Sequence, residues 1–442
     1  MIPTKPLKGF RDHLPETMIQ REKLIETAKA VYRSYGFAPI DTPALEFLEV
    51  LAGQGGDETD KQMFRFEDSG GRQVGMRFDL TVPLARFAAE HIHQLGTPFK
   101  RYHIATVWRG EKPQRGRYRE FMQCDFDTVG TQSVVSDIET ALVIFDLMKA
   151  IGFEEFTIRM NNRKVLNGLL QKSGLEAKGA AVLRAVDKLE KIGEDKVLQE
   201  LMQTAGVSGE QAKSILDLSS LSGTNDEVLD EVEKQVAGNE TGQAGVDELR
   251  QVLQQTRGVG VPESNLKLDI GIARGLDYYT GTVFETTLDA LPAIGSVCSG
   301  GRYDNLTSKF TKLPLPGIGA SLGLDRLLAA QQELGLTESV KTPAPVFVVY
   351  FEKDRLTDYL EIANQLRANG IGVVVYPEAK KLDKQLKYAD KQGFQLAIIV
   401  GDRDFSEQKC QVKNLAQHQQ VEISLQDGFE TLVNHVCSSL SQ

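Results

Sequence analysis

The chain has 442 residues, of which 41% are hydrophobic and 25% charged. At roughly 100–200 residues per domain, this globular composition has material for two to four domains. The formal net charge of −10 argues against a protein that binds nucleic acid through a general positive charge. No apolar run approaches the ~18 residues of a membrane span, and the N-terminal residues lack the apolar stretch of a secretory signal. We therefore expect a cytoplasmic protein that does not bind membranes.

The four cysteines are far apart in the chain, and none forms a CxxC pair: Cys124, Cys298, Cys410 and Cys437. This spacing predicts free thiols without a specific role, in a reducing compartment, and no protein-bound zinc.

The first part of the chain predicts a helix followed by an antiparallel sheet. Residues 16–35 carry apolar side chains at helical spacing, and Gly36 fits a C-terminal cap. Pro39 and Pro43 then favour an extended segment. Six stretches rich in β-branched and aromatic residues predict strands: 74–82, 99–108, 119–129, 154–160, 266–271 and 281–287. Because turns and short loops join most of them, we expect antiparallel pairing.

Two further regions have a different character. Residues 171–258 contain no aromatic residue and have apolar residues at helical spacing, which predicts a helical module inserted into the sheet domain. This module is acidic, with 16 acidic and 9 basic residues between 174 and 258. A polar linker at 336–345 follows. Beyond it, apolar strands alternate with helical patterns, as expected for a parallel α/β domain: strands 345–351, 372–377 and 396–401, helices 355–369 and 379–392.

The most strongly basic stretch lies between two predicted strands. Residues 109–120 contain five basic and two acidic side chains, and Pro113 and Gly116 mark a loop. Guanidinium groups on such a hairpin suit a polyanion, because they bind phosphates through paired hydrogen bonds. A solvated charged hairpin is the alternative that composition alone leaves open.

Two other motifs concentrate polar or flexible residues. RGLDYYTG at 274–281 suits a pocket for a polar small molecule, although a tyrosine-bearing hairpin is the alternative. SGGRYD at 299–304 precedes GIGASLGLDRL at 317–327, where Arg326 should lie on the helix that follows. The GxGxxxG spacing and the absence of a surrounding βαβ unit exclude a dinucleotide fingerprint, and no Walker motif is present. Arg109, Arg274 and Arg326 thus suggest nucleotide chemistry by electrostatic stabilisation.

Together these motifs resemble the class II aminoacyl-tRNA synthetases, and specifically the histidyl-tRNA synthetase family. YGFAPIDTPALE, VWRGEKPQRGRYREF and GIGASLGLDRL match the three class II motifs, while RGLDYYTG and GGRYD match two histidyl-specific segments. The resemblance implies an α+β fold with an antiparallel-sheet catalytic domain, a helical insertion and a C-terminal α/β anticodon-binding domain. The corresponding limits are 1–170 and 259–335 for the catalytic domain, 171–258 for the insertion and 343–442 for the anticodon domain. A homodimer formed through the first motif is also implied.

The resemblance also implies binding residues. Contacts to L-histidine are expected from Asp79, Leu80, Thr81, Arg109, Gln123, Asp127, Arg274, Tyr278 and Tyr279. Contacts to ATP, used with Mg²⁺ and no other cofactor, are expected from Arg109, Glu111, Arg117, Phe121 and Arg326. Arg109 would bind the α-phosphate, and Arg274 would bridge it to the reacting carboxylate, so these two are the expected catalytic residues. Gln114 and Arg115 are the candidates for reading the acceptor end of tRNA(His).

In the C-terminal domain, Lys380, Lys384, Lys387 and Lys391 fall at helical spacing and would form a basic face toward the anticodon, with a solvated face as the alternative. The expected function is therefore ligation of histidine to tRNA(His). One alternative is the regulatory subunit of ATP phosphoribosyltransferase, a non-catalytic relative that senses histidine. That family typically lacks the C-terminal domain and has degraded ATP and tRNA motifs, whereas this chain retains residues 343–442 and Arg109, Glu111, Arg274 and Arg326. A regulatory domain that binds uncharged tRNA is disfavoured because no kinase is fused.

Overall fold

The computed structural model describes residues 2–53, 57–114, 116–272, 278–337 and 340–440. The chain divides into two compact units, one of residues 1–12 and 23–336 and the other of residues 13–22 and 337–442. Among the described residues, no helix combines the length and the apolar character needed to cross a membrane.

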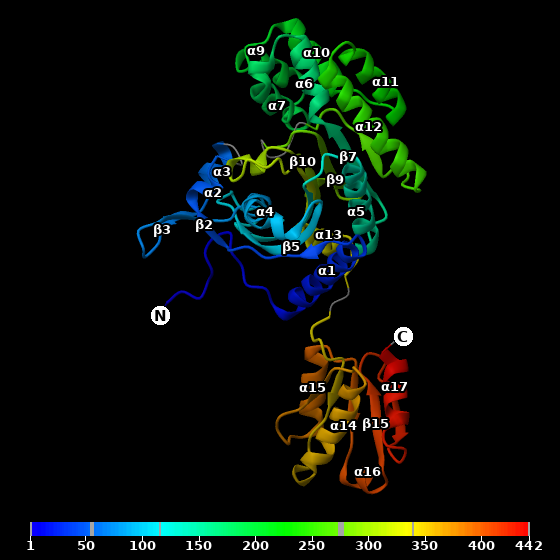
Figure 1. The fold of residues 1–442 in the computed structure, drawn as a ribbon. Coiled ribbons are helices and arrows are strands. Elements are labelled where there is room, and N and C mark those ends of the chain that lie inside the picture. The colour runs from blue at the N-terminus through cyan, green and yellow to red at the C-terminus, as the bar shows by residue number, and fades with distance from the viewer. Residues whose placement is uncertain (1, 54–56, 115, 273–277, 338–339, 441–442) are drawn as a thin grey trace. The chain divides into compact units, whose positions relative to one another are not determined.

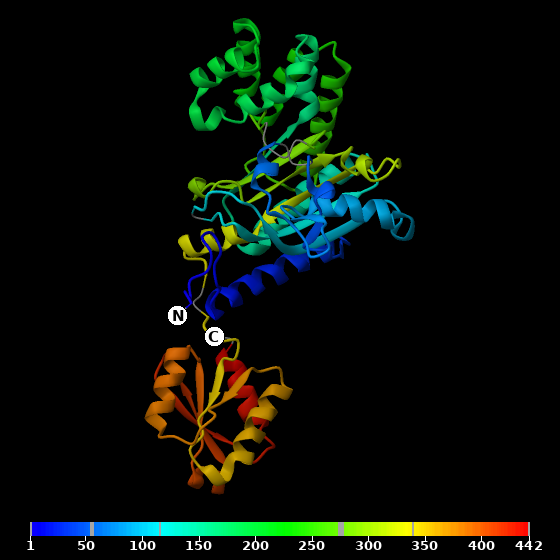
Figure 2. The ribbon, with the colours of Figure 1, turned by 90° about the vertical axis from the view of Figure 1, so that its left-hand side faces the viewer.

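The first unit is built on an eight-stranded sheet with the order β1-β5-β6-β11-β10-β9-β7-β8 (Figures 1 and 2). Its strands are β1 (Ala38–Pro39), β5 (Phe99–Trp108), β6 (Glu120–Val129), β7 (Phe156–Asn162), β8 (Leu266–Leu268), β9 (Thr282–Leu288), β10 (Cys298–Tyr303) and β11 (Gly317–Gly323). All neighbours are antiparallel except β1 with β5 and β7 with β8, which are parallel. The predicted antiparallel sheet is confirmed.

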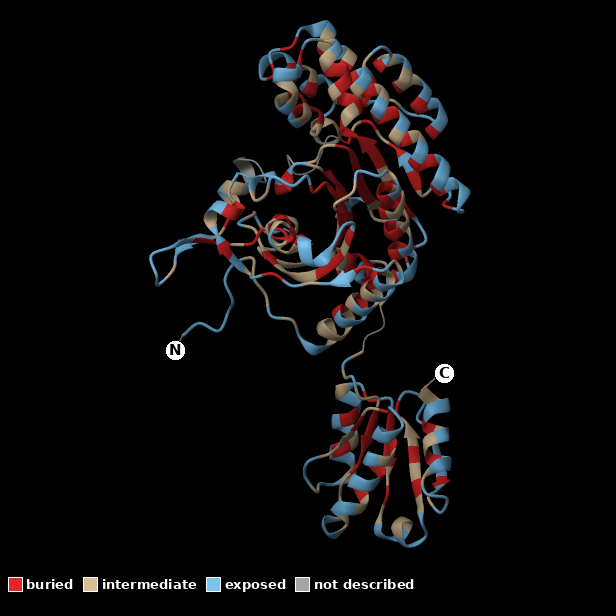
Figure 3. Ribbon diagram, in the orientation of Figure 1, coloured by how far each residue is buried: buried red, intermediate tan, exposed pale blue. Residues whose placement is uncertain are grey.

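Side chains alternate between the two faces of this sheet, and one face forms the core. Cys124 and Phe126 of β6 are completely buried in the same hydrophobic cluster as Tyr32 of α1 (Pro15–Ser34). The Tyr32 hydroxyl donates to the Cys124 carbonyl at 2.8 Å. Helices α5 (Val135–Ile151) and α13 (Leu324–Glu333) also contribute to this cluster, and Figure 3 shows the strands mostly buried. The opposite face of the same strands therefore carries the polar side chains.

Strands β10 and β11 were not predicted, because their glycines have low strand propensity. Their packing explains the glycines. A Cβ at Gly300 would lie 2.2 Å from the Gly319 carbonyl oxygen, and one at Gly319 would lie 2.2 Å from the Phe126 carbonyl oxygen. Side chains at these two positions would force the central strands apart.

The predicted strand over 74–82 is wrong in its second half. Strand β4 (Gln73–Met76) ends early, and helix α4 (Thr81–Leu95) begins within the segment. The Asp79 carboxylate accepts the Val82 N–H at 3.0 Å, and such a bond satisfies a free amide at a helix start. Strand β4 instead belongs to a small sheet with β2 (Leu45–Phe47) and β3 (Arg65–Glu67). Two short helices, α2 (Leu48–Leu51) and α3 (Asp57–Gln62), lie between β2 and β3.

Between β7 and β8 the chain forms a series of helices, coloured green in Figure 1. They are α6 (Arg163–Lys172), η1 (Glu176–Lys178), α7 (Gly179–Val186), α8 (Leu189–Ile192), α9 (Glu194–Gln203), α10 (Gly209–Ser219), α11 (Asn225–Val236) and α12 (Glu240–Gly258). Helix α12 packs closely on α6, since a Cβ at Gly168 would lie 2.5 Å from the Gly242 Cα. Two short 3₁₀ helices, η2 (Pro292–Ile294) and η3 (Leu306–Lys309), flank β10.

The second unit contains a five-stranded sheet with the order β13-β12-β14-β15-β16. The three predicted strands correspond to β12 (Val346–Val348), β13 (Val373–Val375) and β14 (Leu396–Ile399), which are parallel as expected. The antiparallel hairpin of β15 (Lys409–Asn414) and β16 (Gln420–Ser424) was not predicted, so the sheet is mixed. Helices α14 (Leu356–Ala368) and α17 (Glu430–Leu440) contribute to one core and α15 (Leu382–Gln392) to the other. The short elements η4 (Lys353–Arg355) and α16 (Asp402–Ser406) complete the unit.

Candidate active site

The polar face of the large sheet is formed by alternate residues of its central strands. Gln123, Asp125 and Asp127 of β6 share this face, and their partners on β11 are Gly323, Ser321 and Gly319. A Cβ at Gly319 would lie 2.3 Å from the Asp127 Oδ1. The glycine therefore leaves space over the sheet for the carboxylate.

A buried ion pair lies at the centre of this face. Arg101 of β5 is completely buried, and its Nη2 lies 2.6 Å from the Asp127 Oδ2. The same guanidinium donates to the Leu80 carbonyl at 3.3 Å, and the Tyr303 hydroxyl donates to Asp127 at 2.6 Å. Burial raises the pKa of Asp127, while Arg101 and Tyr303 act in the opposite direction. Asp127 is thus held in one orientation by an ion pair and a hydrogen bond.

Asp79 and three tyrosines adjoin this pair. The Tyr278 hydroxyl lies 3.4 Å from the Asp79 Oδ2. The ring of Tyr278 packs edge-on against Tyr279 and Tyr303, with centroids 5.0 and 5.9 Å apart. Burial raises the pKa of Asp79 to about 6, although the Val82 N–H and the Arg109 charge lower it. The result is an aromatic and carboxylate-lined site suited to a polar, cationic small molecule.

Several buried polar atoms of this face lack a hydrogen-bond partner within the part of the chain that the structure describes. They include the Gln123 Oε1, the Asp125 Oδ1 and the Arg101 Nε and Nη1. Each such atom costs roughly 1–3 kcal/mol when it stays unpaired. Burial also raises the pKa of Asp125 to about 7. A polar ligand that paired these atoms would recover part of that cost.

A cluster of three arginines lies beside this site. Arg109 and Arg117, from the hairpin between β5 and β6, approach Glu111 at 3.8 and 3.7 Å. Arg326 of α13 donates to the Ser296 carbonyl. Burial, together with the nearby charges of Arg117 and Arg109, lowers the pKa of Arg326 to about 10. Three guanidinium groups near two carboxylates, Glu111 and Glu285, leave an excess of positive charge, which favours a polyanion such as a triphosphate.

Arg109 connects the two clusters. Its Nε donates to the Phe78 carbonyl at 2.9 Å, next to Asp79, and its guanidinium lies over the Phe121 ring at 5.2 Å. A ligand group held by Arg109 would therefore be close to both the carboxylate pocket and the arginine cluster.

The remaining predicted residues divide into three groups. Arg274 and Arg115 lie outside the described residues. Gln114 is exposed at the hairpin tip, where it forms two backbone hydrogen bonds with Arg117, at 2.9 and 3.1 Å. Thr81 and Leu80 lie at the start of α4, and Leu80 is completely buried, so only its backbone is available to a ligand.

The basic face predicted in the C-terminal domain is smaller than expected. Lys384, Lys387 and Lys391 are exposed on α15, but Lys380 precedes the helix and pairs with Glu378. The helix starts late because the buried Gln385 side chain accepts the Tyr350 N–H at 2.9 Å and donates to the Lys380 carbonyl at 2.7 Å, which holds the preceding segment against β12. Three lysines, rather than four, share the helical face.

Sequence reasoning missed four residues of the polar face: Arg101, Asp125, Tyr303 and Ser321. Side chains alternate along β6, so Asp125 lies on the same face as Gln123 and Asp127. This residue could therefore have been predicted from the strand alone. Tyr303 and Ser321 lie on the two strands that were not predicted.

The fold agrees with comparisons to known proteins. A family model described as histidyl-tRNA synthetase matches residues 9–327, and one described as an anticodon binding domain matches residues 345–435. A histidine–tRNA ligase from Rhodopirellula baltica is 58% identical over 424 residues, 96% of each chain. One from Wolinella succinogenes is 46% identical over 417 residues, 94% of each chain. The crystal structure of histidyl-tRNA synthetase from Nostoc sp. PCC 7120 has a TM-score of 0.87 at 37% identity, covering 98% of this chain and 100% of that one.

A catalytic sheet with an anticodon-binding domain beyond it defines an aminoacyl-tRNA synthetase, as the class II motifs predict. The matches then define the particular branch: the chain belongs to the histidyl-tRNA synthetase family.

Proposed function

We propose that this chain joins L-histidine to tRNA(His) in two steps, with ATP entering as its magnesium complex. In the first step an oxygen of the histidine carboxylate attacks the α-phosphorus, and pyrophosphate leaves. In the second step a hydroxyl of the terminal tRNA ribose attacks the activated carbonyl carbon, and AMP leaves. The observation that carries this proposal is the position of Arg109 between the carboxylate pocket and the arginine cluster.

The amino-acid half of the reaction uses the polar face. Asp79 and Thr81 would bind the α-ammonium group, and Gln123 and Asp127 would contact the imidazole together with Tyr278 and Tyr279. Support comes from the buried carboxylates and the unpaired Gln123 Oε1. A site built to hydrogen-bond one polar side chain rejects analogues that lack its donors by roughly 10⁴–10⁵.

The nucleotide half uses the arginine cluster. Arg109, Arg117 and Arg326 would neutralise the phosphates, Glu111 would accept from the adenine amino group, and Phe121 would stack on the purine. Arg274 would bridge the histidine carboxylate and the α-phosphate. Positioning and charge neutralisation account for most of the catalysis in phosphoryl transfer, and the crowding of guanidinium groups around Arg326 fits that task.

Recognition of tRNA would involve two surfaces. Gln114 and Arg115 would contact the acceptor end from the hairpin tip, and Lys384, Lys387 and Lys391 would face the anticodon, with Lys380 beside them. The exposure of Gln114 and of the three lysines of α15 supports this division. We place the domain limits at 170/171, 258/259 and 335–343, as the motifs indicate.

We also propose a homodimer that acts in the cytoplasm. On the small sheet, Leu45, Phe47 and Phe66 are each about half exposed, and Phe47 and Phe66 flank Val74 across neighbouring strands. Leu45 belongs to the motif that forms dimers in class II synthetases. This face therefore fits a second copy of the chain. The three buried cysteines fit a reducing compartment.

The regulatory relative is not favoured, because the R. baltica and W. succinogenes ligases match nearly the whole chain at 58% and 46% identity. Exchange of labelled pyrophosphate into ATP tests the proposal directly. We expect exchange with histidine and none with the other nineteen amino acids. Histidine binding without exchange would favour the regulatory relative.

A further inference from the structure

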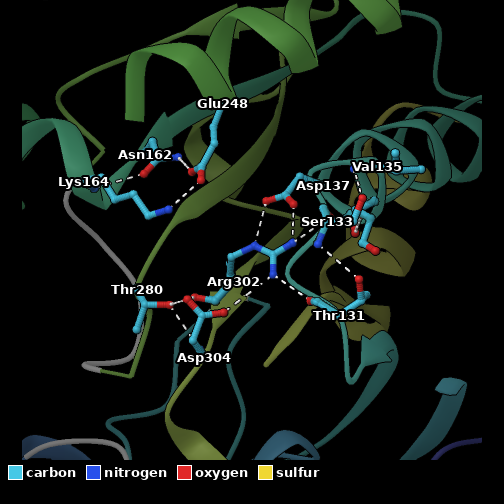
Figure 4. A network of polar contacts seen from close by, with 12 residues as sticks. Thr131, Ser133, Val135, Asp137, Asn162, Lys164, Glu248, Thr280, Arg302 and Asp304 are labelled. Carbon is cyan, nitrogen blue, oxygen red and sulfur yellow. Dashed lines mark hydrogen bonds and ion pairs between the residues drawn. The ribbon is translucent and has the colours of Figure 1, made fainter. Parts of the chain in front are cut away.

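Residues 278–281, the described part of one histidyl-specific segment, meet residues 300–304 of the other in a polar network (Figure 4). The Thr280 hydroxyl donates to the Asp304 carboxylate at 2.7 Å and accepts the Asp304 N–H at 3.1 Å. The Thr280 N–H donates to the Arg302 carbonyl at 2.8 Å. We call Thr280, Arg302 and Asp304 the clasp, because these three hydrogen bonds close one segment on the other.

The clasp is fixed to the rest of the catalytic unit through Arg302. This nearly buried guanidinium forms an ion pair with Asp137 of α5 and donates to the Thr131 and Ser133 carbonyls at 3.1 and 3.2 Å (Figure 4). Four acceptor atoms on one guanidinium hold the end of β10 against the segment that leads into α5.

The three tyrosines of the pocket lie next to the clasp in the chain. Tyr279 directly precedes Thr280, Tyr278 is one residue further away, and Tyr303 lies between Arg302 and Asp304. A Cβ at Gly301 would lie 2.9 Å from the Tyr279 ring, so this ring packs on the backbone of β10. The clasp therefore joins the two segments that carry these rings, in addition to the Tyr303–Asp127 hydrogen bond and the packing of Tyr279 on β10.

We propose that the clasp positions these tyrosines for histidine, so that Thr280 and Asp304 are positioning residues that do not touch the substrate. The proposal rests on the proposed function. Displacing a binding group by about 1 Å is enough to weaken a site substantially, and the clasp bonds are the direct restraint on this displacement.

Thr280→Val tests the proposal, because valine has nearly the same shape and removes the hydroxyl hydrogen bonds to Asp304 and Arg302. We expect the KM for histidine in pyrophosphate exchange to rise about tenfold, as for a lost hydrogen bond, with the KM for ATP changed less than about twofold. Thr280→Ser restores the hydroxyl and should return the KM for histidine to near the wild-type value. If Thr280→Val does not fold, Asp304→Asn is measured in the same way, and we expect the same selective rise.

Glu248→Gln is a matched control in the region that Figure 4 shows. Glu248 of α12 accepts from Asn162 at 2.7 Å and from Lys164, and this bridge does not include the tyrosines. We expect a lower unfolding midpoint with an unchanged KM for histidine. An equal rise in this control, an unchanged KM in Thr280→Val, or equal rises for histidine and ATP would overturn the proposal. A wild-type protein without histidine-dependent exchange would instead refute the proposed function.

Discussion

Three carboxylates and two guanidinium groups set the electrostatics of the amino-acid pocket. Asp79, Asp125 and Asp127 are at most 3% exposed, Arg101 is completely buried, and the Arg109 charge also acts on Asp79. Because the two arginines balance only two of the carboxylates, full ionisation leaves the pocket with excess negative charge. Histidine offers an ammonium group and a basic imidazole, so its cationic groups complement this excess.

Histidine binding should weaken as the pH falls through about 6, because the pKa of Asp79 is raised to about 6 and a protonated carboxyl group no longer attracts the ammonium group. A bound ammonium group favours the ionised carboxylate, so binding releases a proton at low pH. We expect the KM for histidine to rise toward tenfold per pH unit below about 6, measured by pyrophosphate exchange. Asp79→Asn should show a high KM and a flatter profile. Titration of Asp125 and of free histidine is common to both proteins, so parallel profiles would contradict the role of Asp79.

Arg326→Gln should slow adenylate formation about 10²-fold, because one of three groups that neutralise the phosphates is lost. Rapid-quench measurement of a single turnover gives this rate. Arg72→Gln is the control, since Arg72 is exposed and pairs with Asp68 in a turn of the small sheet. Equal rates in the two variants would exclude the role proposed for Arg326.

At the scale of elements, the site depends on two strands, β10 and β11, that have glycine at positions where most strands carry a side chain. Gly319 of β11 admits the Asp127 carboxylate above it, and Gly300 of β10 allows β11 to approach closely. Two other residues of these strands contact the pocket: Ser321 of β11 accepts a hydrogen bond from Gln123, and Tyr303 of β10 donates one to Asp127. Glycine lowers the strand propensity at these positions, and the absence of a side chain leaves the space that the pocket needs.

Gly319→Ala should lower the unfolding midpoint strongly and abolish exchange, because its Cβ would lie 2.2 Å from the Phe126 carbonyl oxygen and 2.3 Å from Asp127. Gly323→Ala is the control on the same strand, where the nearest atom to a Cβ is 3.4 Å away. Thermal unfolding of both variants distinguishes them. Similar unfolding midpoints for the two variants would show that β11 accommodates the added methyl group at position 319 without a loss of stability.

The sequence predicted elements where local preference and packing agree. Residues 99–108 match β5 because β-branched and aromatic residues pair over the whole strand. The prediction failed over 74–82, where the Asp79 side chain accepts a hydrogen bond at the start of a helix. It also failed at β10 and β11, where only tertiary contacts explain the glycines. Gln123 and Asp127 were predicted and lie on one face, but Arg101 and Tyr303 become visible only when the strands are paired. The roles assigned to these residues stay predictions.

At the scale of the whole molecule, the small sheet presents its apolar face to solvent in the isolated chain. Leu45, Phe47 and Phe66 are 46%, 50% and 46% exposed. On the other face of this sheet, Glu46 is buried and pairs with Arg86. The orientation of the sheet is therefore fixed, and its apolar side chains remain available for association.

Phe47→Asp combined with Phe66→Asp should dissociate the homodimer, because each partner would bury two carboxylates in an apolar interface. Analytical ultracentrifugation measures the dissociation constant, which we expect to rise more than about 10²-fold. Val259→Asp, at a residue 68% exposed near the end of α12, is the control. A variant dimer as stable as the wild type would place the interface elsewhere.

The position of β11 in the sheet has a consequence for synthesis on the ribosome. It is the last strand of the catalytic sheet to be made, yet it lies between β6 and β10. Until residue 323 has left the exit tunnel, both neighbours present unpaired backbone edges, and such edges recruit other chains. Nascent chains that stall before Gly317 should therefore depend on chaperones, whereas chains that stall after β11 has left the tunnel have all eight strands paired.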